Sequence, residues 1–238
     1  MGLGRRLFLL AGCTILDSAR RPVRSAETTD RVLVVGDSQA QGLAGGLQRM
    51  YRHETSCRVV DRSRISTGLV SPTRFDWPGS IAGIAEAERG AIAIVMFGAN
   101  DRPPISPNNR ETSPAAVAFR GSYGAHIRAM AAGLEKYCAA VIWVGHPIVR
   151  DPAYSEDMAF LNRLYASQAI GADWFPSWPL FMDDDGNYTA YGKGIDGPST
   201  RLRADDGVHL TPAGYDVLAK AVLPVIDLYR PLHRPPTG

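Results

Sequence analysis

The chain has 238 residues, of which 45% are apolar and 21% are charged, and its formal net charge at pH 7 is +2. This length suffices for one sizeable hydrophobic core, and no apolar stretch approaches the roughly 18–20 residues that a membrane-spanning helix requires. The composition therefore predicts a single folded domain and excludes a transmembrane span.

Residues 1–30 are predicted to form an export signal or leader segment, which leaves residues 31–238 for the folded domain. Two adjacent arginines precede the apolar stretch 7–16, and this order resembles a twin-arginine export signal. A lipoprotein processing site at Cys13 and a disordered N-terminus are the alternatives. We therefore expect an exported protein that resides in the periplasm or the cell envelope.

The net charge of the chain comes from this leader. It contains five basic and three acidic residues, and removing them from the totals of 26 and 24 leaves 21 of each in the domain. A neutral domain offers no electrostatic attraction for nucleic acid or for an anionic membrane surface. We expect neither as a partner, and the sequence leaves the oligomeric state open.

The two cysteines outside the leader, Cys57 and Cys138, are far apart in the sequence. Neither belongs to a CxxC motif or a Cys/His pair, so a metal site or a disulfide framework is not expected. Each lies beside a predicted strand. This favours two buried thiols, with a disulfide between them as the alternative.

Short apolar runs of strand length alternate with segments of helical period from residue 31 onward. The predicted strands are 31–35, 57–61, 91–97, 140–144 and 172–175. The predicted helices are 42–52, 81–89, 113–137, 155–170 and 211–229. The last helix and the longest one each begin with a capping hydroxyl residue followed by proline. This alternation predicts an α/β domain with a parallel sheet and helices on both faces.

Two segments, 103–114 and 183–203, are insertions in this plan. The second contains the sequence Asp-Gly-Asn at 185–187, a good hairpin turn, with alternating residues over 188–191. Its acidic run superficially resembles a calcium-binding loop but lacks the 12-residue spacing and the terminal glutamate. We expect an exposed turn there.

A serine follows the first predicted strand directly, in the tripeptide Gly36-Asp37-Ser38. Ligands in open α/β sheets bind at the carboxyl ends of the strands. Ser38 can act as a nucleophile if a base takes its proton, and the alternative role is a helix N-cap. His209 is the only histidine of the five with an acidic residue, Asp206, three positions before it and a predicted helix start just after it. Asp206 can orient this ring for Ser38, whereas an exposed histidine beside a capped loop is the alternative.

Two further groups can stabilise a negatively charged intermediate. Asn100, in the sequence Gly98-Ala99-Asn100-Asp101, follows the most apolar strand, and its amide can donate to an oxyanion. An Asx-turn is the alternative role for this asparagine. Gly68, in the loop after the second strand, offers a backbone N–H to a closely approaching ligand.

Together these segments resemble the four sequence blocks of the SGNH (GDSL) hydrolases. The blocks are Val34-Val35-Gly36-Asp37-Ser38, Ser66-Thr67-Gly68, Gly98-Ala99-Asn100-Asp101 and Asp206-Gly207-Val208-His209. The resemblance spans about residues 31–229. The first, third and fourth blocks are specific in combination, and the second is loose.

The resemblance implies a three-layer α/β/α, flavodoxin-like sandwich with a five-stranded parallel sheet in the order 2-1-3-4-5. It also implies ester hydrolysis or acyl transfer without a metal or an organic cofactor. By this resemblance Ser38 is the nucleophile, His209 the base and Asp206 the residue that orients it. The N–H groups of Ser38 and Gly68 and the side chain of Asn100 would form the oxyanion hole.

One departure concerns the second block, which in the family usually includes an asparagine before its glycine. Here Asp61 ends the preceding strand instead, so the backbone donor is less firmly assigned than the triad. Three residues near the same sheet edge are further candidates for substrate contact: Phe75, Trp77 and His146. Packing of a loop onto the core is the alternative role for the two aromatic residues.

The expected function is that of a serine esterase acting on small-molecule or polysaccharide acyl esters. We expect the acyl chain of the ester to be short. Exported bacterial members of the family often act on acylated polysaccharide or peptidoglycan. An O-acyltransferase to a glycan hydroxyl uses the same triad, and a non-catalytic glycan-binding module shares the fold. A nucleotide binder with a phosphate loop at Gly42, Gly45 and Gly46 is a weaker alternative, because GxxGG matches no phosphate-binding fingerprint.

Overall fold

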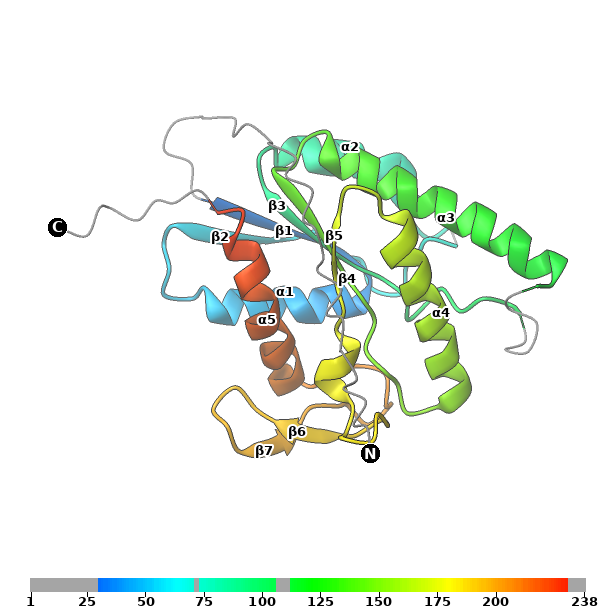
Figure 1. Ribbon diagram of the computed structural model, residues 1–238. Coiled ribbons are helices and arrows are strands. Elements are labelled where there is room, and N and C mark those ends of the chain that lie inside the picture. Colours follow the sequence, from blue (N-terminus) through cyan, green and yellow to red (C-terminus); the bar gives the residue numbers. More distant parts are fainter. Residues whose placement is uncertain (1–29, 71–72, 106–111, 231–238) are drawn as a thin grey trace, which may run out of the picture.

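The computed structural model describes residues 30–70, 73–105 and 112–230 (Figure 1). The predicted leader, apart from its last residue, lies outside the described residues, as does the middle of the 103–114 insertion. No helix of the described ranges is both long enough and apolar enough to cross a bilayer.

A five-stranded parallel sheet forms the middle layer of the domain. Its strands pair in the order β2-β1-β3-β4-β5. Their bounds are β1 Asp30–Gly36, β2 Cys57–Asp61, β3 Ile92–Met96, β4 Ala140–Val144 and β5 Asp173–Phe175. Both the predicted strands and the predicted 2-1-3-4-5 order are confirmed, with end positions that differ by at most one residue.

Five helices cover the two faces of this sheet, as Figure 1 shows. One face carries α2 Trp77–Ala87, α3 Pro114–Glu135 and α4 Pro152–Gln168. The other face carries α1 Ser38–Met50 and α5 Pro212–Asp227. Side chains of successive strand residues alternate between the two layers, because Cβ atoms along a strand point to opposite faces.

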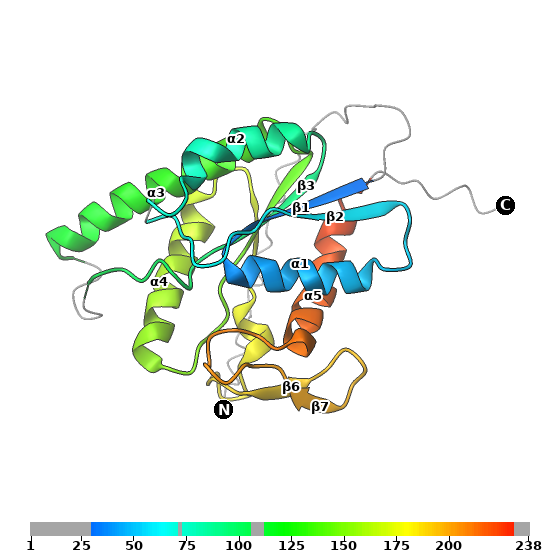
Figure 2. The same cartoon turned by 180° about the vertical axis from the view of Figure 1, so that it is seen from behind.

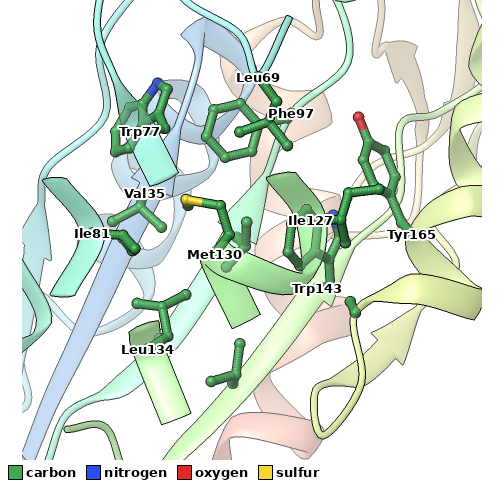
Figure 3. Close-up of a cluster of buried hydrophobic side chains, with 14 of the residues drawn as sticks. Val35, Leu69, Trp77, Ile81, Phe97, Ile127, Met130, Leu134, Trp143 and Tyr165 are labelled. Atoms are coloured by element: carbon green, nitrogen blue, oxygen red, sulfur yellow. The ribbon is translucent and has the colours of Figure 1, made fainter. Parts of the chain in front are cut away.

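Each face of the sheet carries a hydrophobic cluster, and the one that contacts α2, α3 and α4 is rich in aromatic rings (Figure 3). Phe97 contacts the edge of Trp77 with ring centroids 5.2 Å apart, and Trp143 stacks on Tyr165 at the same separation. All four rings are fully or almost fully buried. This cluster supports the loops that follow β2 and β3, because Trp77 lies at the end of the first loop and Phe97 at the start of the second.

On the opposite face of the sheet, α1 packs against α5 (Figure 2). The two helices approach closely because two glycines of α1 leave room for Tyr215. A Cβ at Gly42 would lie 2.0 Å from the Tyr215 ring, and one at Gly46 would lie 2.6 Å from the Tyr215 carbonyl oxygen. Both glycines lie within α1, not in a loop. The alternative of a phosphate-binding loop at these glycines is therefore wrong.

Three helices begin three or four residues earlier than predicted, each capped by an aspartate. Asp37, Asp76 and Asp151 accept a hydrogen bond from a backbone N–H of the first turn of α1, α2 and α4, respectively. In α2 and α4 a proline also occupies the first or second helical position. These caps stabilise first turns that carry little apolar periodicity.

The 183–203 insertion forms two antiparallel turns instead of one. The predicted turn is present, with the Asp183 N–H donating to the Asn187 carbonyl at 2.8 Å. The regular ladder lies further along, between β6 Tyr191–Lys193 and β7 Ser199–Arg201. A short 3-10 helix, η2 Trp178–Phe181, precedes the insertion. It packs Phe181 into the α1/α5 layer and was not predicted.

The two thiols of the domain are unpaired. Cys57 packs in the α1/α5 layer and Cys138 against the opposite one, so the sheet separates them. Burial raises the pKa of Cys57 to about 11 and that of Cys138 to about 12. The expectation of two buried, unpaired thiols is confirmed for Cys57, whereas Cys138 is unpaired but half-buried. Both stay protonated at neutral pH.

Candidate active site

Ser38 is the first residue of α1. It follows the helix cap Asp37, which comes directly after the last residue of β1. The segment turns sharply from strand to helix, which presents the side chain at the carboxyl edge of the sheet. As the first helical residue, Ser38 also has an N–H with no acceptor inside α1. The hydroxyl faces the loop that precedes α5.

His209 reaches Ser38 from the loop before α5, 171 residues away in the sequence. The Nε2 atom of His209 lies 2.8 Å from the Ser38 hydroxyl oxygen. Its Nδ1 atom lies 2.6 Å from a carboxylate oxygen of Asp206. The three side chains form one continuous hydrogen-bonded relay, in the arrangement in which an acid orients a base for a serine.

Asp206 is held in place by its own loop. One carboxylate oxygen accepts the N–H groups of Val208 and His209 at 2.8 and 2.9 Å, and the other faces the imidazole. Partial burial opposes ionisation, but these hydrogen bonds outweigh it and lower the pKa of Asp206 to about 2. The carboxylate is thus ionised at any pH near neutral, and it fixes both the backbone and the ring of His209.

Two buried side chains that sequence reasoning missed support the His209 loop from below. Arg203 is fully buried and donates to the carbonyl oxygens of Gly207 and Val208, each at 3.1 Å. Gln39, next to the serine, donates to the Val208 carbonyl at 3.0 Å and accepts from the Tyr215 hydroxyl at 3.0 Å. Arg203 thus holds the His209 loop from within its own segment, and Gln39 ties this loop to the helix start that carries Ser38. No sequence motif marks either residue.

Asn100 points toward the loop that follows β2. Its amide nitrogen donates to the Thr67 carbonyl at 2.9 Å, which fixes the plane of the amide and leaves its second N–H for another acceptor. Beside it lies a cavity of about 280 Å³ lined by Ser66, Gly68, Arg74 and Asn100. Two of the three predicted oxyanion donors, Gly68 and Asn100, therefore line one cavity.

Gly68 is required at its position by a buried carboxylate. A Cβ there would lie 2.0 Å from an oxygen of Asp101, so any larger residue would displace one of the two segments. Asp101 in turn accepts the N–H groups of Leu69 and Val70 at 2.9 and 3.1 Å. It also accepts the Tyr123 hydroxyl at 2.8 Å. This aspartate holds the loop after β2 against the end of β3, and it is a further residue that sequence reasoning missed.

Asp37, between β1 and Ser38, is a second fully buried carboxyl group. One oxygen accepts the Gln39 N–H at 2.9 Å, and the other has no hydrogen-bond partner among the described residues. Burial raises the pKa of Asp37 to about 7; the Gln39 N–H opposes this and the negative charge of Asp101 adds to it. The group therefore titrates in the folded protein near neutral pH.

Replacing Asp37 by asparagine is expected to flatten the pH dependence of stability. Between about pH 4 and 7 the folded state keeps a proton that the unfolded state has released, so the wild-type free energy of unfolding falls as pH rises. From pH 5 to 8 this group accounts for a loss on the order of 2–3 kcal/mol. Asparagine preserves the cap and cannot ionise. Urea unfolding of the wild type, Asp37→Asn and the exposed control Asp184→Asn at both pH values measures the effect, and equal slopes in all three would contradict it.

The three predicted substrate contacts are placed differently from one another. Trp77 and His146 are both fully buried. The Trp77 indole N–H donates to the Thr67 hydroxyl at 2.9 Å, and the His146 ring contacts the Pro147 carbonyl at 2.8 Å. The expectation that these two residues contact substrate is therefore wrong: Trp77 supports the loop that follows β2, and His146 lies in the interior, where burial lowers its pKa to about 3. Phe75 is partly exposed and packs edge-on against Trp77, so it remains a candidate.

Comparison with known proteins gives a family and a fold. A family model described as "Protein of unknown function (DUF459)" matches residues 31–225. No curated protein sequence matches the chain. Among solved structures, the chain is similar to a G-D-S-L family protein from Desulfitobacterium hafniense DCB-2, with a TM-score of 0.56 and 17% identity over 83% of this chain and 99% of that one.

Two further solved structures are also similar. TesA gives a TM-score of 0.54 and 19% identity over 84% of this chain and 99% of that chain. A catalytic mutant of Axe2, an acetylxylan esterase from Geobacillus stearothermophilus, gives 0.54 and 18% over 84% and 95%. At these identities the likeness shows the fold, and the fold is that of the SGNH (GDSL) hydrolases.

Proposed function

The chain belongs to the DUF459 family with the SGNH hydrolase fold, and we propose that it is a serine esterase that hydrolyses short-chain O-acyl esters through an acyl-enzyme on Ser38. The observation that carries the proposal is the continuous relay from Ser38 through His209 to Asp206, with distances of 2.8 and 2.6 Å. A binding module needs no such relay. The esterase named among the structural neighbours supports the same chemistry.

In the proposed reaction Nε2 of His209 takes the proton of Ser38 as its oxygen attacks the ester carbonyl. The resulting imidazolium is stabilised by the ionised Asp206 beside Nδ1. His209 then gives its proton to the departing alcohol, which leaves the acyl group on Ser38. In the second half His209 activates a water that releases the acid and restores the serine.

The developing oxyanion would lie beside the cavity that Gly68 and Asn100 line. Its donors are the free N–H of Asn100, the Ser38 N–H at the start of α1 and the Gly68 N–H. The rigid hold of Thr67 on the Asn100 amide supports this role, because a donor fixed before the reaction costs no reorganisation during it. Sequence alone supplies the expectation of export, and an acylated glycan of the cell envelope is the natural substrate that we propose on that basis.

A serine-directed fluorophosphonate and a short-chain aryl ester test the proposal on the same sample. We expect stoichiometric labelling of the purified protein, with the mass increase located on the peptide that contains Ser38, and turnover of 4-nitrophenyl acetate that the label abolishes. Addition of a glycan acceptor during turnover measures how the acyl group partitions between water and a hydroxyl. Absence of both labelling and turnover, or labelling at another serine, would refute the assignment.

A further inference from the structure

The cavity beside the proposed oxyanion hole contains a single charged side chain. Of its four lining residues, Ser66, Gly68 and Asn100 are neutral and Arg74 is a cation. At about 280 Å³ it is slightly smaller than the roughly 300–1,000 Å³ typical of pockets that enclose drug-sized ligands. The carbonyl of a bound ester and the guanidinium of Arg74 would therefore share one small compartment.

The positive charge of Arg74 is not compensated by a carboxylate among the described residues. Its one hydrogen bond there runs from Nη1 to the Ser66 carbonyl at 3.4 Å, which is long for such a bond. By contrast, Arg102, in the loop after β3, lies 2.6 Å from Asp157. Arg74 thus has donors to offer a ligand without breaking an ion pair.

The wall of the cavity is rigid on the side that faces Arg74. Ser66 has a φ of 58°, the one left-handed backbone among the described residues other than glycine. Such strain persists where the surroundings hold it in place, and it gathers at binding sites. The next residue is fixed on both sides, because the Thr67 hydroxyl donates to the Arg64 carbonyl at 2.6 Å and accepts from the Trp77 indole.

Asp101, the carboxylate that contacts Gly68, does not neutralise this cavity. Asp101 lies behind Gly68, is fully buried and does not line the cavity. Its charge is directed into the loop, where two backbone N–H groups and the Tyr123 hydroxyl bind it. Burial raises its pKa, which further weakens its negative charge at the cavity.

We propose that Arg74 binds a negatively charged group of the substrate, so that the preferred ester carries a carboxylate, sulfate, sulfonate or phosphate close to the carbonyl that Ser38 attacks. This inference rests on the proposed esterase function and specifies its substrate class. The planar guanidinium suits an oxyanion of this kind, which it can bind through two parallel hydrogen bonds. The anionic group can belong to the acyl part or to the alcohol part.

Two matched pairs of esters distinguish these parts. The acyl pair is the 4-nitrophenyl esters of 3-sulfopropanoate and of its neutral sulfonamide. The alcohol pair is 4-sulfophenyl acetate and 4-sulfamoylphenyl acetate. For each ester kcat/KM is measured for the wild type, Arg74→Gln, Arg74→Lys and the control Arg58→Gln. Arg58 is an exposed residue near the start of β2, away from the carboxyl edge.

We expect Arg74→Gln to lower kcat/KM about 10-fold for the anionic member of at least one pair and less than twofold for its neutral partner. The ratio of wild type to variant cancels the intrinsic reactivity of each ester. Arg74→Lys should retain part of the preference, Arg58→Gln all of it, and added salt should reduce it. Equal losses on anionic and neutral esters, or no loss, would overturn the inference while the esterase stands. No turnover of any ester by the wild type would refute the proposed function and this inference with it.

Discussion

Replacement of Ser38 by alanine is expected to lower kcat for 4-nitrophenyl acetate by about 10⁴-fold or more, without loss of folding. Among the described residues, this hydroxyl is the one hydrogen-bond partner of Nε2 of His209, at 2.8 Å, so its removal leaves the proposed base with nothing to activate except water. Alanine is a good residue for the first turn of a helix, and the cap of α1 comes from Asp37, so α1 should remain intact. Single-turnover kinetics and fluorophosphonate labelling measure the loss.

The relay predicts a specific non-additivity for this substitution. Residues that act as one unit lose nearly all of their effect when any member is removed, so Ser38→Ala and the double variant with His209→Ala should have similar rates. Ser122→Ala, on the exposed surface of α3, serves as the control for replacement of a hydroxyl. A Ser38→Ala variant that retains more than about one per cent of wild-type kcat would contradict the assignment of the nucleophile.

Replacement of Asn100 by alanine is expected to lower kcat by about 10²–10³-fold and to change KM little. Loss of one oxyanion donor has an effect of this size in other serine hydrolases, because the donor binds the intermediate much more strongly than the ground-state carbonyl. The effect should appear equally in kcat and kcat/KM. Steady-state kinetics on the same aryl ester test it.

The structural role of Asn100 must be separated from its catalytic one. Its amide also donates to the Thr67 carbonyl, and loss of that bond should lower the free energy of unfolding by about 1 kcal/mol. Urea unfolding measures this contribution independently of catalysis. A variant with lowered stability but kcat within fivefold of the wild type would show that the side chain supports the loop and does not bind the oxyanion.

The sheet could be predicted almost completely from the sequence, because each of its central strands is a continuous apolar run. β1, β3 and β4 are buried on both faces, and such strands lack polar interruptions that would blur their ends. Helix starts were harder. α2 and α4 begin with a pattern of cap and proline similar to the one that identified α3 and α5, yet their caps are aspartates and not hydroxyl residues. Apolar periodicity begins only one turn later.

The proposed catalytic residues could be found from sequence because they lie in short motifs after a strand or just before the last helix. Their supports could not. Gln39 and Asp101 act through contacts with segments between 30 and 170 residues away, and no local pattern encodes such pairings. Arg203 contacts residues only four and five positions away, but a buried arginine cannot be told from an exposed one by its sequence alone. The same limit explains the correction for Trp77 and His146. Aromatic and imidazole rings near a site suit substrate contact and core packing equally well, and only the fold decides which occurs.

The packing of α1 against α5 has a consequence for the order in which the protein becomes active. The proposed nucleophile lies at the first turn of α1, and the proposed base lies just before α5, the last helix among the described residues. During synthesis the ribosome completes the sheet and four helices before α5 exists to dock on the glycines of α1. The contact between Ser38 and His209 also closes a loop of 171 residues, and such long-range contacts slow folding. We therefore expect the nascent chain to stay inert toward esters until α5 has emerged, and recovery of turnover after dilution from denaturant should report the docking of α5.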